Sequence, residues 1–221
     1  MSRFHSLQVH DVIRETPDCI SIGFAIPAEL RADFAFQHGQ YLTLKVMVAG
    51  TELRRSYSIC SSPLQPELLR IAVKKVADGR VSTQLVDHLK AGDTLEVMTP
   101  MGNFTTPLDA ERERHFVAFA GGSGITPVMS ILQAVLAKEP RSRFTLFYAN
   151  SDAERIIFRQ QLESLAQAHD RFKPVTIIDV PKKGGMCGLF KSKPAGDPLL
   201  TGITADSRAV RALHRDPPLI E

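Results

Sequence analysis

The first half of the chain alternates apolar and polar positions in short runs separated by turns that contain glycine. Residues 40–46 read Q-Y-L-T-L-K-V, residues 69–76 read L-R-I-A-V-K-K-V, and residues 94–98 read T-L-E-V-M. A period of two is typical of strands that bury one face. Several short strands at this spacing predict an antiparallel barrel or sandwich, interrupted by one short helix near residues 82–89.

The second half has a different rhythm, in which continuous apolar runs alternate with helical patterns. A helix is predicted over residues 126–137, with Thr126 as N-cap and Pro127 at the first helical position. A second helix is predicted over residues 156–168, where apolar positions share one face. Three short apolar runs are typical of buried strands: residues 115–120, 143–149 and 174–180. Strand, helix, strand, helix, strand is half of a doubly wound parallel sheet.

The fold class that follows is β plus α/β, an antiparallel barrel followed by a partial doubly wound parallel-sheet domain. Residues 1–108 are expected to form the barrel, and residues 109–180, which begin with a charged segment, the partial second domain. Residues 181–221 are an uncertain C-terminal segment in which 206–214 can form a short helix. No fourth buried strand follows in the sequence, so the half sheet would leave an edge and an apolar face open.

Composition narrows the function classes. The 221 residues are 43% hydrophobic and 23% charged, with a net charge of +3 and no long basic run, which predicts no nucleic-acid partner. No segment approaches the roughly 20 apolar residues of a membrane helix, so no membrane partner is expected. The three cysteines, Cys19, Cys60 and Cys187, are far apart and predict neither a disulfide framework nor a metal site. A cytoplasmic location fits these features.

The most informative motif is R-R-S-Y-S-I-C over residues 54–60. Arg55 can bind a phosphate oxygen bidentately. The ring of Tyr57 can stack on an isoalloxazine, and Ser58 can hydrogen-bond near the flavin N5, so we take these two residues as the catalytic candidates. The alternative is an ordinary amphipathic strand with a surface arginine.

Two glycine turns lead into predicted helices. Residues 79–83, G-R-V-S-T, place a helix start where a phosphate can bind, although a simple turn with a helix cap has the same pattern. Residues 121–127, G-G-S-G-I-T-P, follow a buried strand, and their glycines allow a pyrophosphate to approach the backbone. Pro127 stands where the usual G-x-G-x-x-G motif has its third glycine, and a tight turn without a ligand is the alternative.

The end of the next strand, at Asn150-Ser151, is where doubly wound folds contact the adenosine ribose. No acid stands at the strand end itself, which mildly disfavours NAD. Arg155 and Arg159 can reach a 2′-phosphate, or they can simply form a solvated helix face.

These motifs resemble the ferredoxin-NADP reductase family, over roughly residues 4–180. The resemblance implies a six-stranded flavin barrel, a nucleotide domain, and FAD and NADPH (or NADH) as cofactors, with hydride passing from the nicotinamide to the flavin. It implies FAD contacts at Arg55, Tyr57, Ser58, Ile71, Ala72, Val73, Gly79, Val81 and Ser82. It implies nucleotide contacts at Gly122, Gly124, Ile125 and Thr126.

The sequence departs from that family in its last third. The C-x4-C-x2-C spacing of a plant-type iron–sulfur domain and the C-G-P strand motif beside the nicotinamide are both absent, so the chain reads as a truncated or altered member. The expected function is an FAD-dependent NAD(P)H oxidoreductase that delivers electrons to an oxygenase component or a separate acceptor. Two alternatives remain: a free-standing flavin reductase or diaphorase, and a non-catalytic flavoprotein that only docks on a partner.

Overall fold

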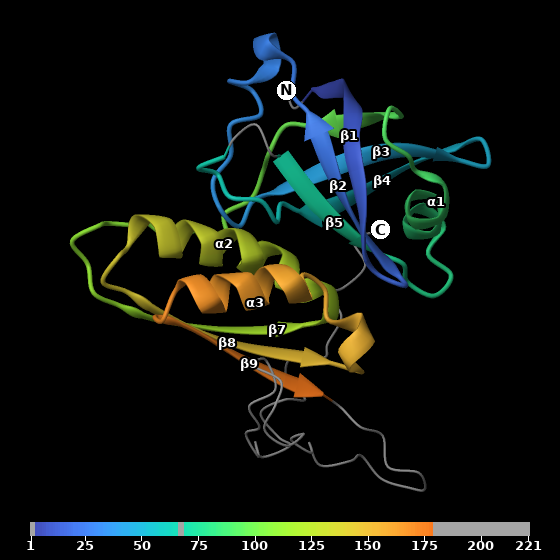
Figure 1. Ribbon diagram of the computed structural model, residues 1–221. Helices are drawn as coiled ribbons and strands as arrows, with labels where there is room; N and C mark the ends of the chain where they lie inside the picture. Colours follow the sequence, from blue (N-terminus) through green and yellow to red (C-terminus); the bar gives the residue numbers. More distant parts are fainter. Residues whose placement is uncertain (1–2, 66–68, 179–221) are drawn as a thin grey trace, which may run out of the picture. The chain divides into compact units, whose positions relative to one another are not determined.

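The computed structural model describes residues 3–65 and 69–178 (Figure 1). The chain forms two compact units. The first comprises the residues up to Glu113 together with Thr126–Arg141, and the second comprises Arg114–Ile125 and the described residues from Ser142 onward. None of the helices in the described ranges is long and apolar enough to cross a membrane.

The first unit is built on a six-stranded antiparallel sheet in the order β4-β3-β6-β1-β2-β5. A bridge between Ile59 and Ile71 brings the end of β4 next to β5, so the two outer strands meet and the sheet curls into a barrel. The predicted antiparallel barrel and its six strands are confirmed. The strands are β1 (Phe4–Thr16), β2 (Cys19–Ala25), β3 (Tyr41–Val48), β4 (Thr51–Ser58), β5 (Leu69–Lys74) and β6 (Thr94–Met98).

The barrel encloses a continuous apolar core. Leu7, Ile22, Leu42 and Val97 come from four different strands and have no solvent exposure. Two short helices complete this part of the unit, η1 (Ala28–Leu30) and α1 (Arg80–His88). Helix α1 adds Val81, Leu85 and Val86 to the same core, because residues four apart lie on one helix face.

Helix α2 (Ile125–Lys138) packs in the first unit against the segment that follows β4. Ser130 Oγ donates to the Ser61 carbonyl at 2.7 Å, and Gln133 Nε2 donates to the Cys60 carbonyl at 2.9 Å. The prediction of Thr126 as N-cap is wrong, because a 3₁₀ turn, η2 (Gly122–Gly124), leads directly into the helix at Ile125. A proline in the first turn is tolerated because its missing N–H would have no intrahelical partner there.

The second unit holds a parallel sheet in the order β7-β8-β9, which confirms the predicted α/β pattern. Its strands are β7 (His115–Gly121), β8 (Arg143–Asn150) and β9 (Phe172–Ile178), and its helical elements are η2, η3 (Ala153–Arg155) and α3 (Arg159–Ala168). Helix α3 contacts β9 and runs along the sheet in Figure 1.

The helix predicted over residues 156–168 is too long at its start. Ile156, Ile157 and Phe158 are buried but precede α3, and Phe158 has a left-handed backbone with φ of 61°. Their apolar character reflects burial of an irregular segment rather than one face of a helix. The short helix expected over residues 206–214 lies outside the described residues.

Candidate functional site

Strand β4 places the two largest side chains of the R-x-Y-S motif on one face. In the antiparallel register, Arg55 is opposite Leu44 and Tyr57 is opposite Leu42, and directly opposed residues point to the same side. Ser58 is the last residue of the strand and is opposite Tyr41.

The other face of β4 is occupied by contacts within the protein. Arg54 forms an ion pair with Glu52 at 2.7 Å and lies 5.0 Å from the ring centre of Phe4. Ser56 Oγ forms a hydrogen bond with Thr43 Oγ1 at 3.0 Å. These residues of the strand therefore have their polar groups satisfied locally.

Arg55, Tyr57 and Ser58 differ from these neighbours. Among the residues described, Arg55 has no carboxylate partner and donates only to the Arg54 carbonyl at 2.7 Å, and the hydroxyls of Tyr57 and Ser58 have no hydrogen-bond partner. Burial raises the pKa of Tyr57 to about 12, an effect that the positive charge of Arg55 partly opposes. A cation, an aromatic ring and a hydroxyl thus remain available for a phosphate and a flat heterocycle, so these residues fit FAD.

Strand β5 carries the three residues expected to line the flavin. Ile71 and Val73 have no solvent exposure and belong to the barrel core, while Ala72 is 5% exposed. Because the side chains of Ile71 and Val73 are buried in the core, only their backbone can contact a ligand. Strand β5 stands at the end of the sheet order. The bridge between Ile59 and Ile71 sets this strand beside the end of β4.

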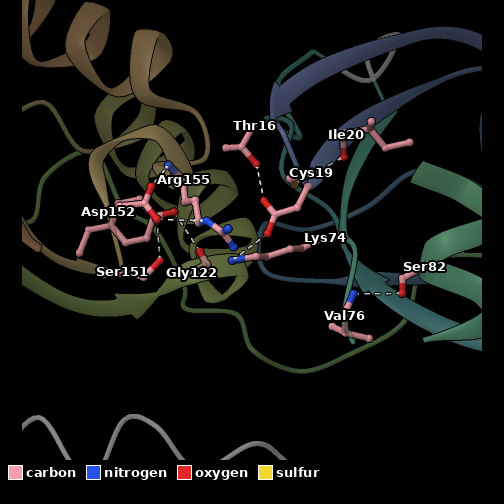
Figure 2. A network of polar contacts seen from close by, with 12 residues as sticks. Thr16, Cys19, Ile20, Lys74, Val76, Ser82, Gly122, Ser151, Asp152 and Arg155 are labelled. Atoms are coloured by element: carbon pink, nitrogen blue, oxygen red, sulfur yellow. Dashed lines mark hydrogen bonds and ion pairs between the residues drawn. The ribbon is translucent and has the colours of Figure 1, made fainter. Parts of the chain in front are cut away.

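The turn before α1 is stabilised by hydrogen bonds of the Ser82 hydroxyl. Ser82 Oγ donates to the Gly79 carbonyl at 3.3 Å and accepts from the Val76 N–H at 3.3 Å, the second of which is drawn in Figure 2. A Cβ on Gly79 would overlap with Ser82 Oγ and Val76 Cγ2, so glycine is required there by packing. The side chain of Val81 is 2% exposed, which leaves its backbone N–H, in the first turn of the helix, as the group that can meet a phosphate.

The second glycine turn follows β7 and is built differently. Gly122 has a φ of 47°, a conformation that favours glycine, and its carbonyl accepts a hydrogen bond from Tyr148 Oη at 2.9 Å. A Cβ on Gly121 or Gly124 would meet no atom within 4 Å. Packing therefore does not require glycine at these two positions, and the open space beside them fits a ligand that approaches the backbone closely.

Asn150 lies at the strand end where the sequence predicts a ribose contact, although it is not among the nucleotide contacts that the resemblance implies. It ends β8, where Ala149 is paired with Gly121, so it lies beside the glycine turn. It is only 6% exposed, and neither its Oδ1 nor its Nδ2 has a partner among the described residues. Buried polar atoms are nearly always hydrogen-bonded, so Asn150 fits a nucleotide bound at the carboxyl ends of β7 and β8. Its position at a strand end was the sequence signal.

The two arginines that can reach a 2′-phosphate both have acidic partners. Arg155 Nε lies 3.0 Å from Asp152 Oδ2, and Figure 2 shows the Asp152 side chain also contacting Ser151. Arg159 Nε lies 2.9 Å from Glu163 Oε1. A 2′-phosphate would have to compete with these carboxylates.

Two of the cysteines are free and buried, Cys19 and Cys60. Burial raises the pKa of the Cys19 thiol to about 12 and also raises that of Cys60, so neither is a ready nucleophile. Within residues 3–65 and 69–178, no group of three or more His, Cys, Asp or Glu side chains is placed to hold a metal ion.

Comparison with known proteins agrees with this arrangement. The oxidoreductase FAD-binding domain family matches residues 6–106, and the oxidoreductase NAD-binding domain family matches residues 119–189. The chain belongs to the FAD- and NAD-binding oxidoreductases of the ferredoxin reductase type. The resemblance seen in the motifs, and the two cofactor classes it implies, are confirmed.

Several relatives of this oxidoreductase are components of oxygenase systems. One subunit of the 1,2-phenylacetyl-CoA epoxidase from Escherichia coli K12 is 46% identical over 165 residues, which are 75% of this chain and 46% of that protein. The ferredoxin reductase component of 3-ketosteroid-9-alpha-monooxygenase from Rhodococcus rhodochrous is 41% identical over 169 residues, 76% of this chain and 47% of that protein.

A solved structure gives the same picture. Phthalate dioxygenase reductase, described as a modular structure for electron transfer from pyridine nucleotides to [2Fe-2S], matches with a TM-score of 0.66 and 31% identity. The match covers 82% of this chain and 54% of that one. The chain thus spans about half the length of the curated relatives it matches.

Proposed function

We propose that this protein is an NAD(P)H-dependent flavin oxidoreductase that passes electrons to an oxygenase-type acceptor. FAD, when bound, supplies the chemistry, which is acceptance of a hydride from NAD(P)H and release of electrons to the acceptor. The observation that carries the proposal is the set of polar ends on Arg55, Tyr57 and Ser58 that have no ion-pair or side-chain partner on β4.

In this proposal the residues of the protein bind and orient the flavin and the nucleotide. Arg55 neutralises phosphate charge, and Tyr57 covers one face of the flavin ring, which also excludes water. Ser58 orients the ring by a hydrogen bond near N5. The backbone of the Gly121–Gly124 turn and the side chain of Asn150 hold the nucleotide, and the free space beside Gly121 and Gly124 supports that role.

The proposal also concerns the protein that accepts the electrons. The curated relatives are components of a phenylacetyl-CoA epoxidase and a ketosteroid monooxygenase, so we infer an oxygenase component of that kind, such as one of phenylacetate catabolism, as the partner. We place the reaction in the cytoplasm, where scattered free thiols stay reduced.

The test is the visible spectrum of the purified, FAD-reconstituted protein under anaerobic conditions, before and after addition of NADPH or NADH. We expect flavin absorbance that bleaches with at least one of the two. A flavin that binds but stays oxidised with both would contradict the enzyme and favour a docking flavoprotein. Failure to bind FAD at all would refute the assignment of Arg55, Tyr57 and Ser58. Bleaching followed by transfer only to free dyes would favour a diaphorase.

A further inference from the structure

The segment that follows strand β4 is hydrogen-bonded to both neighbouring strands of the barrel. The Ile59 N–H donates to the Gln40 carbonyl at 2.9 Å, directly before β3. The Cys60 N–H donates to the Arg70 carbonyl on β5 at 2.9 Å, and the Arg70 N–H donates to Ser61 Oγ at 3.0 Å. The carbonyls of Cys60 and Ser61 have their partners elsewhere, on helix α2.

Two side chains of α2 bind these consecutive carbonyls. Ser130 Oγ donates to the Ser61 carbonyl at 2.7 Å, and Gln133 Nε2 donates to the Cys60 carbonyl at 2.9 Å. Gln133 Nε2 also donates to the Met129 carbonyl at 3.1 Å, which fixes the orientation of the amide. Ser130 has no solvent exposure, and a hydrogen bond shielded from water is electrostatically stronger than one in water.

The attachment lies next to residues that are expected to contact the two cofactors. Ser58, expected near the flavin N5, directly precedes the attached segment. On α2, Thr126, where the resemblance implies a nucleotide contact, precedes Ser130 by four residues and Gln133 by seven. Positions with this spacing lie along one face of a helix. Thr126 and the two donors therefore form one polar row on a helix that belongs to the same unit as β4.

Apolar contacts alone would hold α2 in the unit without fixing its exact place. Met129, Leu132 and Val135 have no solvent exposure. Their burial would change little if the helix moved slightly along its axis, because the hydrophobic effect is not directional. The two hydrogen bonds to consecutive carbonyls are directional, and a displacement of about 1 Å would break them. The polar pair therefore determines the position of the helix, and the apolar side chains provide most of its burial.

We propose that Ser130 and Gln133 are positioning residues for hydride transfer, which fix α2, and Thr126 with it, relative to the segment that follows Ser58. The inference rests on the proposed function, because it concerns the same reaction. In that step a C–H bond of the dihydronicotinamide breaks and an N–H bond forms at flavin N5, so the nucleotide is oxidised and the flavin reduced by two electrons. A misplacement of about 1 Å can lower a rate about 100-fold, so neither side chain needs to touch a cofactor.

The test is anaerobic stopped-flow reduction of the FAD-saturated protein by NADPH or NADH, with the variants Ser130→Ala and Gln133→Met. We expect the limiting rate of flavin bleaching to fall at least about tenfold in each. FAD affinity and the half-saturating nucleotide concentration should change less than about threefold. An unchanged limiting rate in either variant, or an equal loss of FAD affinity, would overturn the proposal.

A matched control removes a hydroxyl of the same kind from another helix. Ser164 Oγ donates to the Gln160 carbonyl on α3 at 2.9 Å, and Ser164→Ala should leave the limiting rate unchanged. A rate that falls as much in this control would mean that any lost helix contact slows the reaction, and would also overturn the proposal. If Ser130→Ala does not fold, Gln133→Met, at a partly exposed position, decides alone.

A second measurement does not depend on turnover. Binding of NADP⁺ or NAD⁺ to the oxidised, FAD-saturated protein should perturb the flavin absorbance, and at nucleotide saturation this difference spectrum should be smaller in both α2 variants. Equal difference spectra would mean that the two side chains only stabilise the fold. A wild-type flavin that stays oxidised with NADPH and NADH would refute the proposed function and this inference together. Wild-type bleaching at a rate that the variants share would refute the inference alone.

Discussion

The proposed flavin-binding strand β4 and the proposed nucleotide-binding turn after β7 offer groups to a phosphate by opposite means. Strand β4 presents side chains, and Arg55, Tyr57 and Ser58 matter because their polar ends have no ion-pair or side-chain partner. The turn after β7 presents backbone, and Gly121 and Gly124 matter because nothing occupies the space where a side chain would be. A site of the first kind is weakened by removing atoms, whereas one of the second kind is weakened by adding them.

Substitutions of two arginines on opposite faces of β4 test the role of its side chains, and they are expected to have the largest effect. Arg55→Ala should weaken FAD binding about 10- to 100-fold, because a hydrogen bond to a charged group contributes about 1.5–3 kcal/mol. Arg54→Ala, which removes the same side chain from the opposite face where it is paired with Glu52, should change FAD affinity less than about threefold. Fluorescence titration of the apoprotein with FAD measures both. Equal losses would mean that a general positive field, not the motif, binds the flavin.

The proposed nucleotide site is tested by a substitution that should raise stability but weaken nucleotide binding. Asn150→Leu keeps the shape of the side chain but removes two buried polar atoms that have no partner among the described residues. Without nucleotide, the free energy of unfolding should rise by about 1–3 kcal/mol, because an unsatisfied buried polar group is costly. Nucleotide binding should weaken by a similar free energy. Urea unfolding and NAD(P)H titration give the two numbers, and a variant that is less stable without nucleotide would contradict the role of Asn150.

The two glycine turns should respond differently to a methyl group. Gly79→Ala should lower the free energy of unfolding by about 1–3 kcal/mol, because its Cβ would overlap with Ser82 Oγ and Val76 Cγ2, and overpacking costs that much. Gly121→Ala has a compatible φ of −130° and open space, so stability should change by less than about 1 kcal/mol while nucleotide binding weakens. Urea unfolding compares the two variants, and similar loss of stability in both would remove the distinction between a packed and an open glycine.

The smallest effect concerns the pH dependence of Tyr57. Its pKa is raised from the ordinary 10 to about 12 by burial, so the folded protein retains a proton that the unfolded chain loses. This contribution to stability is complete below pH 10 and is lost as pH rises through about 12. Titration of the apoprotein by ultraviolet absorbance should show a tyrosine transition near pH 12 whose amplitude falls in Tyr57→Phe. An unchanged amplitude in the variant would contradict the assignment to Tyr57.

The sequence was sufficient for features that depend on local pattern. The run over residues 94–98 matches β6 residue for residue, because strict alternation marks a half-buried strand. It was not sufficient where tertiary burial overrides periodicity. Ile156 to Phe158 looked helical because they are apolar, but the left-handed backbone of Phe158 delays α3 to Arg159.

Some parts of the candidate site could not have been found from the sequence. The R-x-Y-S motif identified Arg55 and Tyr57, but only the register with Leu44 and Leu42 shows that they share a face. That Asn150 lacks partners among the described residues is a property of three-dimensional packing.

The attachment of α2 to Cys60 and Ser61 has a consequence for anyone who exchanges parts between reductases. The barrel unit is discontinuous, since it takes up Thr126–Arg141 after the chain has already built β7. A transplanted barrel that stops at residue 108 would leave the Cys60 and Ser61 carbonyls without the hydrogen bonds that Gln133 and Ser130 donate. The smallest exchangeable module therefore runs through residue 141 and carries β7 with it.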